Sequence, residues 1–150
     1  MLTPAQVQTA TRLRHTFIDA GFTADGVLGL LGASAYAALA REEFVPARRV
    51  LRDHSGLLVD FIRLFVIDEV LDVQALSPNF PLDDVRSLDL VEGLDHIHAV
   101  VDVRPYGEPD TDWYVVSDHS AGRGALARDE VSADHVLGVG GASLTLARIT

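Results

Sequence analysis

Residues 57–67 decide the fold and read LLVDFIRLFVI. At helical spacing their bulky side chains form one broad apolar stripe, made by Leu57, Leu58, Phe61, Leu64 and Phe65. Asp60 and Arg63 fall on the other side of the same helix. We therefore predict that this stretch is the central core helix of the protein.

The residues before this stretch also predict helices. TPAQ at 3–6 has the pattern of a capping box with Pro at the first helical position, and Gly21 fits a helix end. A second stretch, 27–40, is rich in Ala and Leu and contains Gly29 and Gly32. Small residues at such close spacing are typical of tight helix–helix packing, so we expect these glycines to lie at a helix contact.

The residues that follow change from a helical to a strand pattern. Pro46 begins a short helix that runs through Arg52, and two weaker helices are expected over 72–76 and 82–92. From His96 to Arg104 the apolar residues alternate with other residues, which predicts a half-buried strand.

A hairpin completes this part of the chain. PYGEPDT at 105–111 is dense in turn-forming residues, and WYVVS at 113–117 predicts the return strand. Trp113 and Tyr114 fall on opposite strand faces, so we expect one to belong to the core and the other to a surface.

Together these elements predict an α+β fold, mainly helical, with a winged-helix-like C-terminal β-hairpin. We divide the chain into an N-terminal helical segment (1–44), a winged-helix-like unit (45–118), and a linker and lead-in (119–150).

Composition narrows the classes of function. The 150 residues include no Cys and no Lys, which excludes disulfides, thiol nucleophiles, Schiff-base lysines and Walker-type phosphate loops. No apolar run is long enough to cross a bilayer and no signal peptide opens the chain, so we expect a cytoplasmic protein without membrane contact. The formal net charge is -10, and the acidic residues concentrate after residue 67. This charge disfavours nucleic acid and favours a basic protein partner.

The sequence offers no catalytic constellation. GVGGAS at 138–143 resembles a dinucleotide loop, but the buried strand that such a loop needs before it is missing. His96 and His98 lie two residues apart on one strand face; without further ligands we interpret them as surface residues and predict no metal site. The helix that would recognise DNA, 81–93, carries four acidic residues against Arg86, so we expect no DNA binding.

Four segments have the order and approximate spacing of one known family: DGVLGLLGASAYAALAR (25–41), RLF (63–65), VRPY with DWYVVSD (103–106 and 112–118), and HVLGVGGASLTLA (135–147). Together they resemble the N-terminal region of actinobacterial class I S-adenosylmethionine-dependent methyltransferases, and are similar to release-factor glutamine methyltransferases. The sequence VIDE (66–69) departs from this pattern, because the family usually has Leu-Gly there.

The resemblance implies a role for the last segment. In such enzymes the glycine turn leads into the first helix flanking the methyltransferase fold, shortly before the cofactor loop. No LDLGTG-type loop and no Asn-Pro-Pro-Tyr-type motif occurs in this sequence. The resemblance therefore implies an N-terminal domain that precedes a catalytic domain and is inactive alone. The residues that would border the cofactor or substrate cleft are Gly138, Gly140, Gly141, Ser143 and Thr145.

Two functions follow as expectations. The first is a substrate-recognition or orienting domain of an S-adenosylmethionine-dependent, protein-glutamine-directed methyltransferase. Its partners would be the catalytic domain and a basic protein substrate, and no cofactor would bind this chain alone. The alternative is a stand-alone acidic winged-helix module for protein interaction or homodimerisation.

Overall fold

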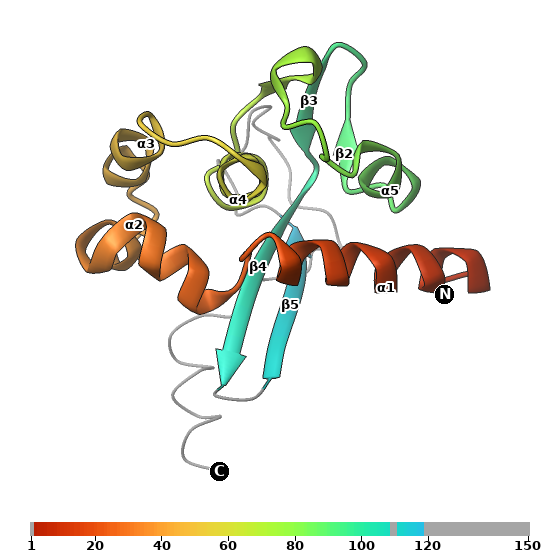
Figure 1. The fold of residues 1–150 in the computed structure, drawn as a ribbon, viewed down its shortest axis with the longest axis horizontal. Helices are drawn as coiled ribbons and strands as arrows, with labels where there is room; N and C mark the ends of the chain where they lie inside the picture. The colour runs from red at the N-terminus through yellow and green to blue at the C-terminus, as the bar shows by residue number, and fades with distance from the viewer. Residues whose placement is uncertain (1, 109–110, 119–150) are drawn as a thin grey trace.

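The computed structural model describes residues 2–108 and 111–118 and shows an α+β fold, which confirms the fold class predicted from the sequence. Helices make up most of the regular structure, and the strands form two small antiparallel sheets (Figure 1). In chain order the elements are α1 (Pro4–Asp19), α2 (Ala24–Leu39), α3 (Val45–Leu51), α4 (Leu57–Phe61), η1 (Ile62–Val66), β1 (Leu71–Asp72), η2 (Val73–Ala75), α5 (Leu82–Ser87), β2 (Val91–Glu92), β3 (His96–Ala99), β4 (Val101–Glu108) and β5 (Thr111–Asp118).

Helix α1 begins and ends where the sequence predicts. The Thr3 hydroxyl accepts a hydrogen bond from the Gln6 backbone N–H, and the Gln6 side chain accepts one from the Thr3 N–H, which confirms the capping box. At the other end Gly21 adopts a φ of +79°. The Phe22 N–H then donates to the Phe17 carbonyl, and the two rings meet edge-on with centroids 5.1 Å apart. Glycine permits this left-handed turn, which satisfies the last carbonyls of the helix.

Helix α2 contains a kink instead of the expected glycine-mediated helix contact. Gly32 has a φ of +81° and interrupts the helix. A Cβ atom added at Gly29 or Gly32 would have no neighbouring atom within 4 Å, so the prediction that these glycines pack against another helix is wrong. The buried face of α2 is made by other residues: Val27, Leu31, Ala35, Ala38 and Leu39.

The central core helix is confirmed, and all of its residues are buried or half-buried. Its second half, η1, is π-helical, with the Ile67 N–H donating to the Ile62 carbonyl. Asp60 is only 8% exposed and accepts a hydrogen bond from the Ser77 backbone N–H. A π-helical turn shifts the helical phase, so apolar residues on more than one side reach the core. The expected division into an apolar and a polar side is therefore wrong at Asp60.

The segment after the core helix is less helical than its sequence pattern predicts. The expected helix over 72–76 is a single 3₁₀ turn, η2, that follows the two-residue strand β1. The expected helix over 82–92 ends at Ser87, because Asp89 adopts a φ of +55° and turns the chain. Residues 91–92 then pair with β3 as strand β2. Sheet pairing here overrides local helical spacing.

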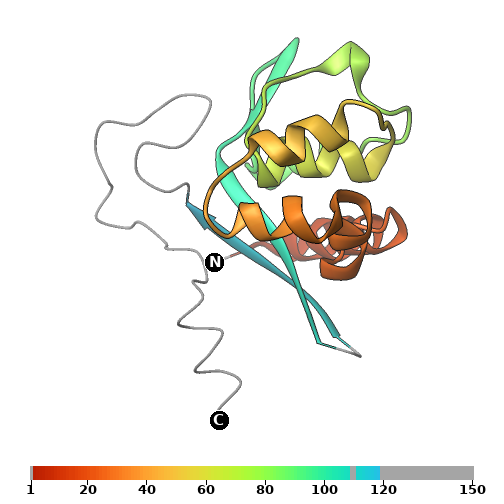
Figure 2. The same cartoon turned by 90° about the vertical axis from the view of Figure 1, so that its left-hand side faces the viewer.

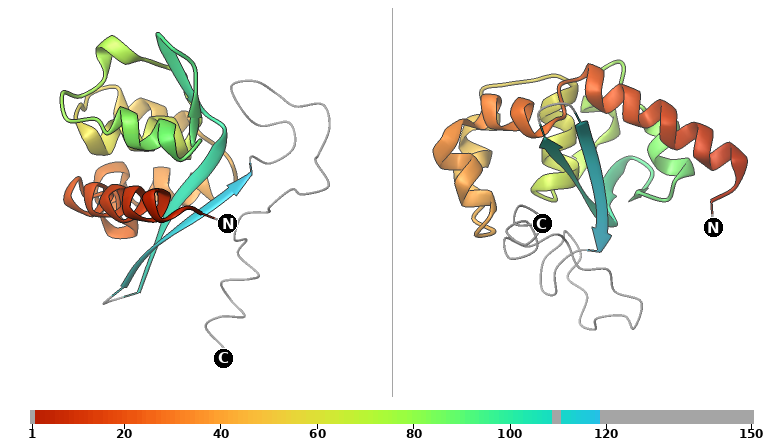
Figure 3. Two further views of the ribbon diagram at one scale, coloured as in Figure 1. Left: turned by 90° about the vertical axis from the view of Figure 1, so that its right-hand side faces the viewer. Right: turned by 90° about the horizontal axis from the view of Figure 1, so that it is seen from below.

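Strands β1, β3 and β2 form one sheet in that order, and β3 is antiparallel to both neighbours. Beyond Val100 the chain continues as β4, which pairs with β5 from Val101 opposite Asp118 to Glu108 opposite Thr111. This is the C-terminal β-hairpin expected from the alternating pattern. Figures 2 and 3 show it crossing α1 and extending past the helices.

The core is one continuous cluster shared by the N-terminal helices and the later elements. Phe17 of α1 lies 4.8 Å, between ring centroids, from Phe61 of α4, and Phe22 lies 5.6 Å from the same ring. Both residues therefore connect the segment 1–44 to the unit 45–118 through direct aromatic contact.

Helix length also bears on membrane insertion. In residues 2–108 and 111–118, no single helix has both the length and the apolarity to cross a bilayer. Helices α1 and α2 taken together would meet those two requirements, with a bend of 45° between them.

Candidate functional site: an apolar groove between α1 and β5

The site residues predicted from the resemblance lie outside the part of the chain that the structure describes. These are Gly138, Gly140, Gly141, Ser143 and Thr145, so their place beside a cofactor cleft stays a prediction.

His96 and His98 lie on β3, and each stands opposite an acidic residue of a neighbouring strand. His96 is exposed and stands opposite Asp72, whereas His98 is half-buried and stands opposite Glu92. The His98 Nε2 and Glu92 Oε2 atoms are 3.6 Å apart. Across residues 2–108 and 111–118, no three His, Asp or Glu side chains come together as metal ligands.

The acidic helix α5 uses its charges in contacts within the protein. Asp84 receives two hydrogen bonds from Arg12 of α1, the shorter at 2.7 Å. These bonds and the charge of Asp84 raise the pKa of the Arg12 guanidinium. Arg86 donates to the backbone carbonyls of Gly93 and Leu94. Arg12 and Arg86 are therefore both engaged in contacts within the protein.

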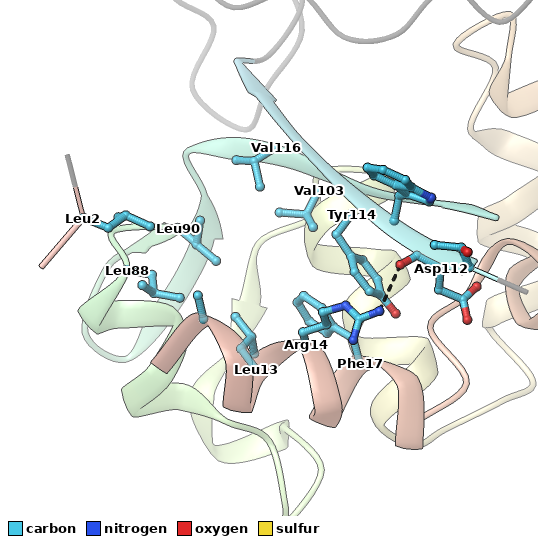
Figure 4. Close-up of a pocket in the computed structure, with 13 residues that line it drawn as sticks. Leu2, Leu13, Arg14, Phe17, Leu88, Leu90, Val103, Asp112, Tyr114 and Val116 are labelled. Carbon is cyan, nitrogen blue, oxygen red and sulfur yellow. Dashed lines mark hydrogen bonds between the residues drawn. The ribbon is translucent and has the colours of Figure 1, made fainter. Parts of the chain in front are cut away.

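An open apolar groove runs between α1 and β5 and has a volume of about 660 Å³ (Figure 4). Its walls come from three regions that are far apart in sequence: α1, the segment after α5, and the β4–β5 hairpin. The lining residues are Leu2, Ala10, Leu13, Arg14, Phe17, Leu88, Leu90, Val103, Thr111, Asp112, Trp113, Tyr114 and Val116.

Helix α1 supplies one wall because its residues recur at helical spacing. Ala10, Leu13 and Phe17 lie three or four positions apart and share one face of the helix. Leu13 and Phe17 are each only 3% exposed, so they form a fixed floor. Arg14 stands beside them at the rim, and its Nη2 donates to the Asp112 backbone carbonyl at 3.3 Å.

Strand β5 supplies the opposite wall, to which it contributes Thr111, Asp112, Trp113, Tyr114 and Val116. Tyr114 lies against Phe17 with ring centroids 5.1 Å apart, and its hydroxyl donates to the Phe22 carbonyl at 2.7 Å. Burial raises the pKa of Tyr114 to about 12, so its phenol stays neutral and keeps donating this bond at physiological pH. Trp113 is 63% exposed. The expectation that one of these two residues belongs to the core and the other to a surface is confirmed.

The lining of the groove is mainly apolar, with a few polar groups. Its polar side chains are Arg14, Thr111, Asp112 and Tyr114, and the Tyr114 hydroxyl is already engaged in the protein. Among the described residues that line the groove, Asp112 is the one carboxylate and there is no histidine. A concave apolar surface with a few polar groups at its rim is the usual form of a ligand or peptide site.

Sequence reasoning missed this groove because its walls lie about a hundred residues apart. The signal that was available is the alternation of Trp113 and Tyr114, which marked β5 as a strand with one surface-facing aromatic residue. The packing of β5 against α1 depends on the hairpin register and on the position of Phe17. Neither can be predicted from one local sequence pattern.

Comparison with known proteins identifies the framework between α1 and β4. No curated protein and no solved structure matches the chain. A family model described as a domain of unknown function, DUF7059, matches residues 19–102, more than half of the 150 residues, and the protein therefore belongs to this family.

Proposed function

We propose that this chain is the non-catalytic recognition domain of an S-adenosylmethionine-dependent methyltransferase, with a protein glutamine as the acceptor suggested by the resemblance. The observation that carries the recognition role is the open apolar groove between α1 and β5, a concave surface with a few polar groups in its lining. The enzyme class comes from the resemblance of four sequence segments.

The resembling segments and the groove meet at the hairpin. Residues 103–106 lie in β4 and residues 112–118 lie in β5, so one of these segments forms a wall of the groove. The family match ends at Asp102, so β5 and most of α1 lie outside it. The proposal for the groove therefore rests on the geometry and the resemblance, and not on the family match.

The cofactor would be held by the catalytic domain, and we expect none to bind this chain alone. Glycine-rich turns let a backbone approach a ligand closely. Gly138, Gly140 and Gly141, with Ser143 and Thr145, would border that cleft. The acidic surface would favour a basic protein substrate, and the expected compartment is the cytoplasm.

Calorimetric titration of S-adenosylmethionine tests the enzyme class. The ligand is added to this chain and to the product of its reading frame extended beyond Thr150. We expect binding by the extended protein only. Binding by neither protein, or a reading frame that stops, would remove the methyltransferase assignment, and binding by the short chain would contradict a non-catalytic role.

A matched pair of variants tests the recognition role in the extended protein. Leu88 lines the groove, whereas Leu94 lies outside it and is 83% exposed. We expect Leu88→Asp to raise the KM for a glutamine-containing protein acceptor about tenfold, with kcat and cofactor affinity unchanged, because a carboxylate opposes an apolar contact. Leu94→Asp should leave all three quantities unchanged. Equal effects of the two variants would contradict recognition by the groove.

The second candidate is the stand-alone interaction or dimerisation module. It is favoured by the exposure of Trp113 and Val116, 63% and 48%, on the strand that forms the groove wall. Analytical ultracentrifugation separates the two functions, because this module would give a concentration-dependent dimer and no cofactor binding.

A further inference from the structure

The register of the hairpin determines which backbone groups of β5 point away from β4. In an antiparallel pair, residues that exchange two hydrogen bonds alternate with residues that exchange none. Pro105 stands opposite Tyr114 and has no N–H to donate. This pair therefore exchanges none, and the backbone N–H and C=O of Tyr114 point to the outer edge of β5. Alternation gives Asp112 and Val116 the same orientation.

A contact from α1 supports this orientation independently. Arg14 reaches the Asp112 carbonyl from outside the hairpin, at 3.3 Å, so that carbonyl does point to the outer edge. In the parts of the chain that the structure describes, β5 pairs with β4 alone. The outer edge next to Tyr114 and Val116 is thus an unpaired strand edge, which is a template for adding another strand.

The groove lies beside this same edge. The side chains of Tyr114 and Val116 line it, together with Leu13 of α1 and Leu90 (Figure 4). Residues directly opposite each other on neighbouring strands point to the same sheet face. A strand added to β5 would therefore place the side chains opposite Tyr114 and Val116 over the apolar groove, while its other side chains face away.

Charge indicates the composition of the added strand. Residues 68–118, which include β5 and the segment lining the groove, hold thirteen Asp and Glu side chains against two Arg. The exposed ones include Asp72, Asp83, Asp89, Glu92 and Asp95. Asp112 stands at the rim of the groove itself. Opposite charges across an interface favour association and fix its register. A segment with basic residues at its ends complements this surface.

We propose that an extended, basic segment of a protein substrate adds as a third strand, antiparallel to β5, at the outer edge of β5 and places alternate apolar side chains in the groove. The identity of the partner as a substrate rests on the proposed function, whereas the strand addition itself depends only on the edge and the groove. Main-chain hydrogen bonds would supply affinity, and the groove would supply selectivity for apolar residues at every second position.

The test uses the full chain and the peptide acetyl-RVTVTVR-amide, without cofactor. Amide hydrogen exchange is followed by NMR before and after the peptide is added. We expect the Tyr114 and Val116 amides to exchange fast in the free protein and at least tenfold more slowly with the peptide. The amides of Trp113 and Val115 point to β4 and should be slow in both states.

Two matched peptides separate strand addition from simple apolar contact. N-methylation of the Val residues blocks the N–H groups that would face β5, and should weaken binding at least tenfold by calorimetry. N-methylation of the Thr residues blocks the outward groups and should leave the affinity within about threefold. The protein variant Val116→Pro removes an N–H at the outer edge of β5 but no hydrogen bond to β4. It should weaken binding of the unmethylated peptide as much as N-methylation of the Val residues does.

Any of three outcomes would overturn the proposal. No binding of the peptide at millimolar concentration removes it, and so does equal binding of the two methylated peptides. Slow exchange of Tyr114 and Val116 in the free protein would mean that the edge is already filled, by a second copy if it depends on protein concentration and by this chain if it does not. None of these outcomes alters S-adenosylmethionine binding, so failure here is distinct from failure of the methyltransferase assignment.

Discussion

Helix α1 separates two apolar regions, a closed aromatic core and an open groove, and Phe17 takes part in both. On the core side its ring meets the rings of Phe22, Phe61 and Phe65. On the groove side the same residue forms part of the floor. The two regions have similar side chains and differ in whether another element covers them.

The core is closed because a central helix is buried against α1. Around the π-helical turn of η1, nine of the ten residues from 59 to 68 are buried, and Arg63 is half-buried. The groove is open because β5 is the last strand of a two-stranded sheet, so no other strand in the described part of the chain pairs with its outer edge. Composition alone therefore does not tell a core from a binding surface.

The largest expected effect on stability comes from removing an aromatic ring from the closed core. Phe61 is 0% exposed and contacts four other aromatic rings, so Phe61→Ala should lower the free energy of unfolding by about 3–5 kcal/mol. Trp113→Ala, on the exposed strand, should change it by less than about 0.5 kcal/mol. Urea denaturation measures both. A comparable loss in the Trp113 variant would show that the groove side is closed in solution.

An intermediate effect on stability is expected where the start of α2 lies against the end of α1. A Cβ atom added to Gly26 would lie 1.8 Å from the Gly21 carbonyl oxygen, whereas one added to Gly29 would meet nothing within 4 Å. Gly26→Ala should therefore destabilise the protein by about 1–3 kcal/mol through the forced shift of α1 against α2. Gly29→Ala, in the same helix, should stabilise it by up to about 1 kcal/mol. Thermal unfolding compares them, and destabilisation of equal size would contradict the α1–α2 contact.

The smallest effect is expected where the groove wall is attached to the core. Tyr114→Phe removes the hydrogen bond to the Phe22 carbonyl and should lower the unfolding free energy by about 1 kcal/mol at neutral pH. The folded-state pKa of Tyr114 is raised from about 10 to about 12, so this stabilisation is full below pH 10 and is lost as the pH rises towards 12.

The pH dependence of the unfolding free energy is compared between the wild type and the Tyr114→Phe variant. Burial also raises the pKa of Tyr106, which gives a loss of the same sign in both proteins. The difference between their unfolding free energies, measured by urea denaturation between pH 8 and pH 12, should therefore shrink above pH 10. A difference that stays constant would mean that the Tyr114 hydroxyl is not held by the core.

The sequence by itself determined the elements whose causes are local. The capping box at Thr3 and the glycine turn at Gly21 act within one helical turn, and both limits of α1 were predicted. Strict alternation predicted the hairpin, because successive side chains in a strand point to opposite faces. The α+β class follows from these local signals together.

Only the tertiary structure decided where these elements meet. Asp60 is buried because the backbone N–H of Ser77, seventeen positions later, approaches its carboxylate. Residues 91–92 became a strand because β3 offered an unpaired edge. The groove exists because Phe17 and Tyr114, from the two ends of the described chain, pack together while no second described strand pairs with β5. Such contacts depend on the free energy of packing distant segments, which no local spacing encodes.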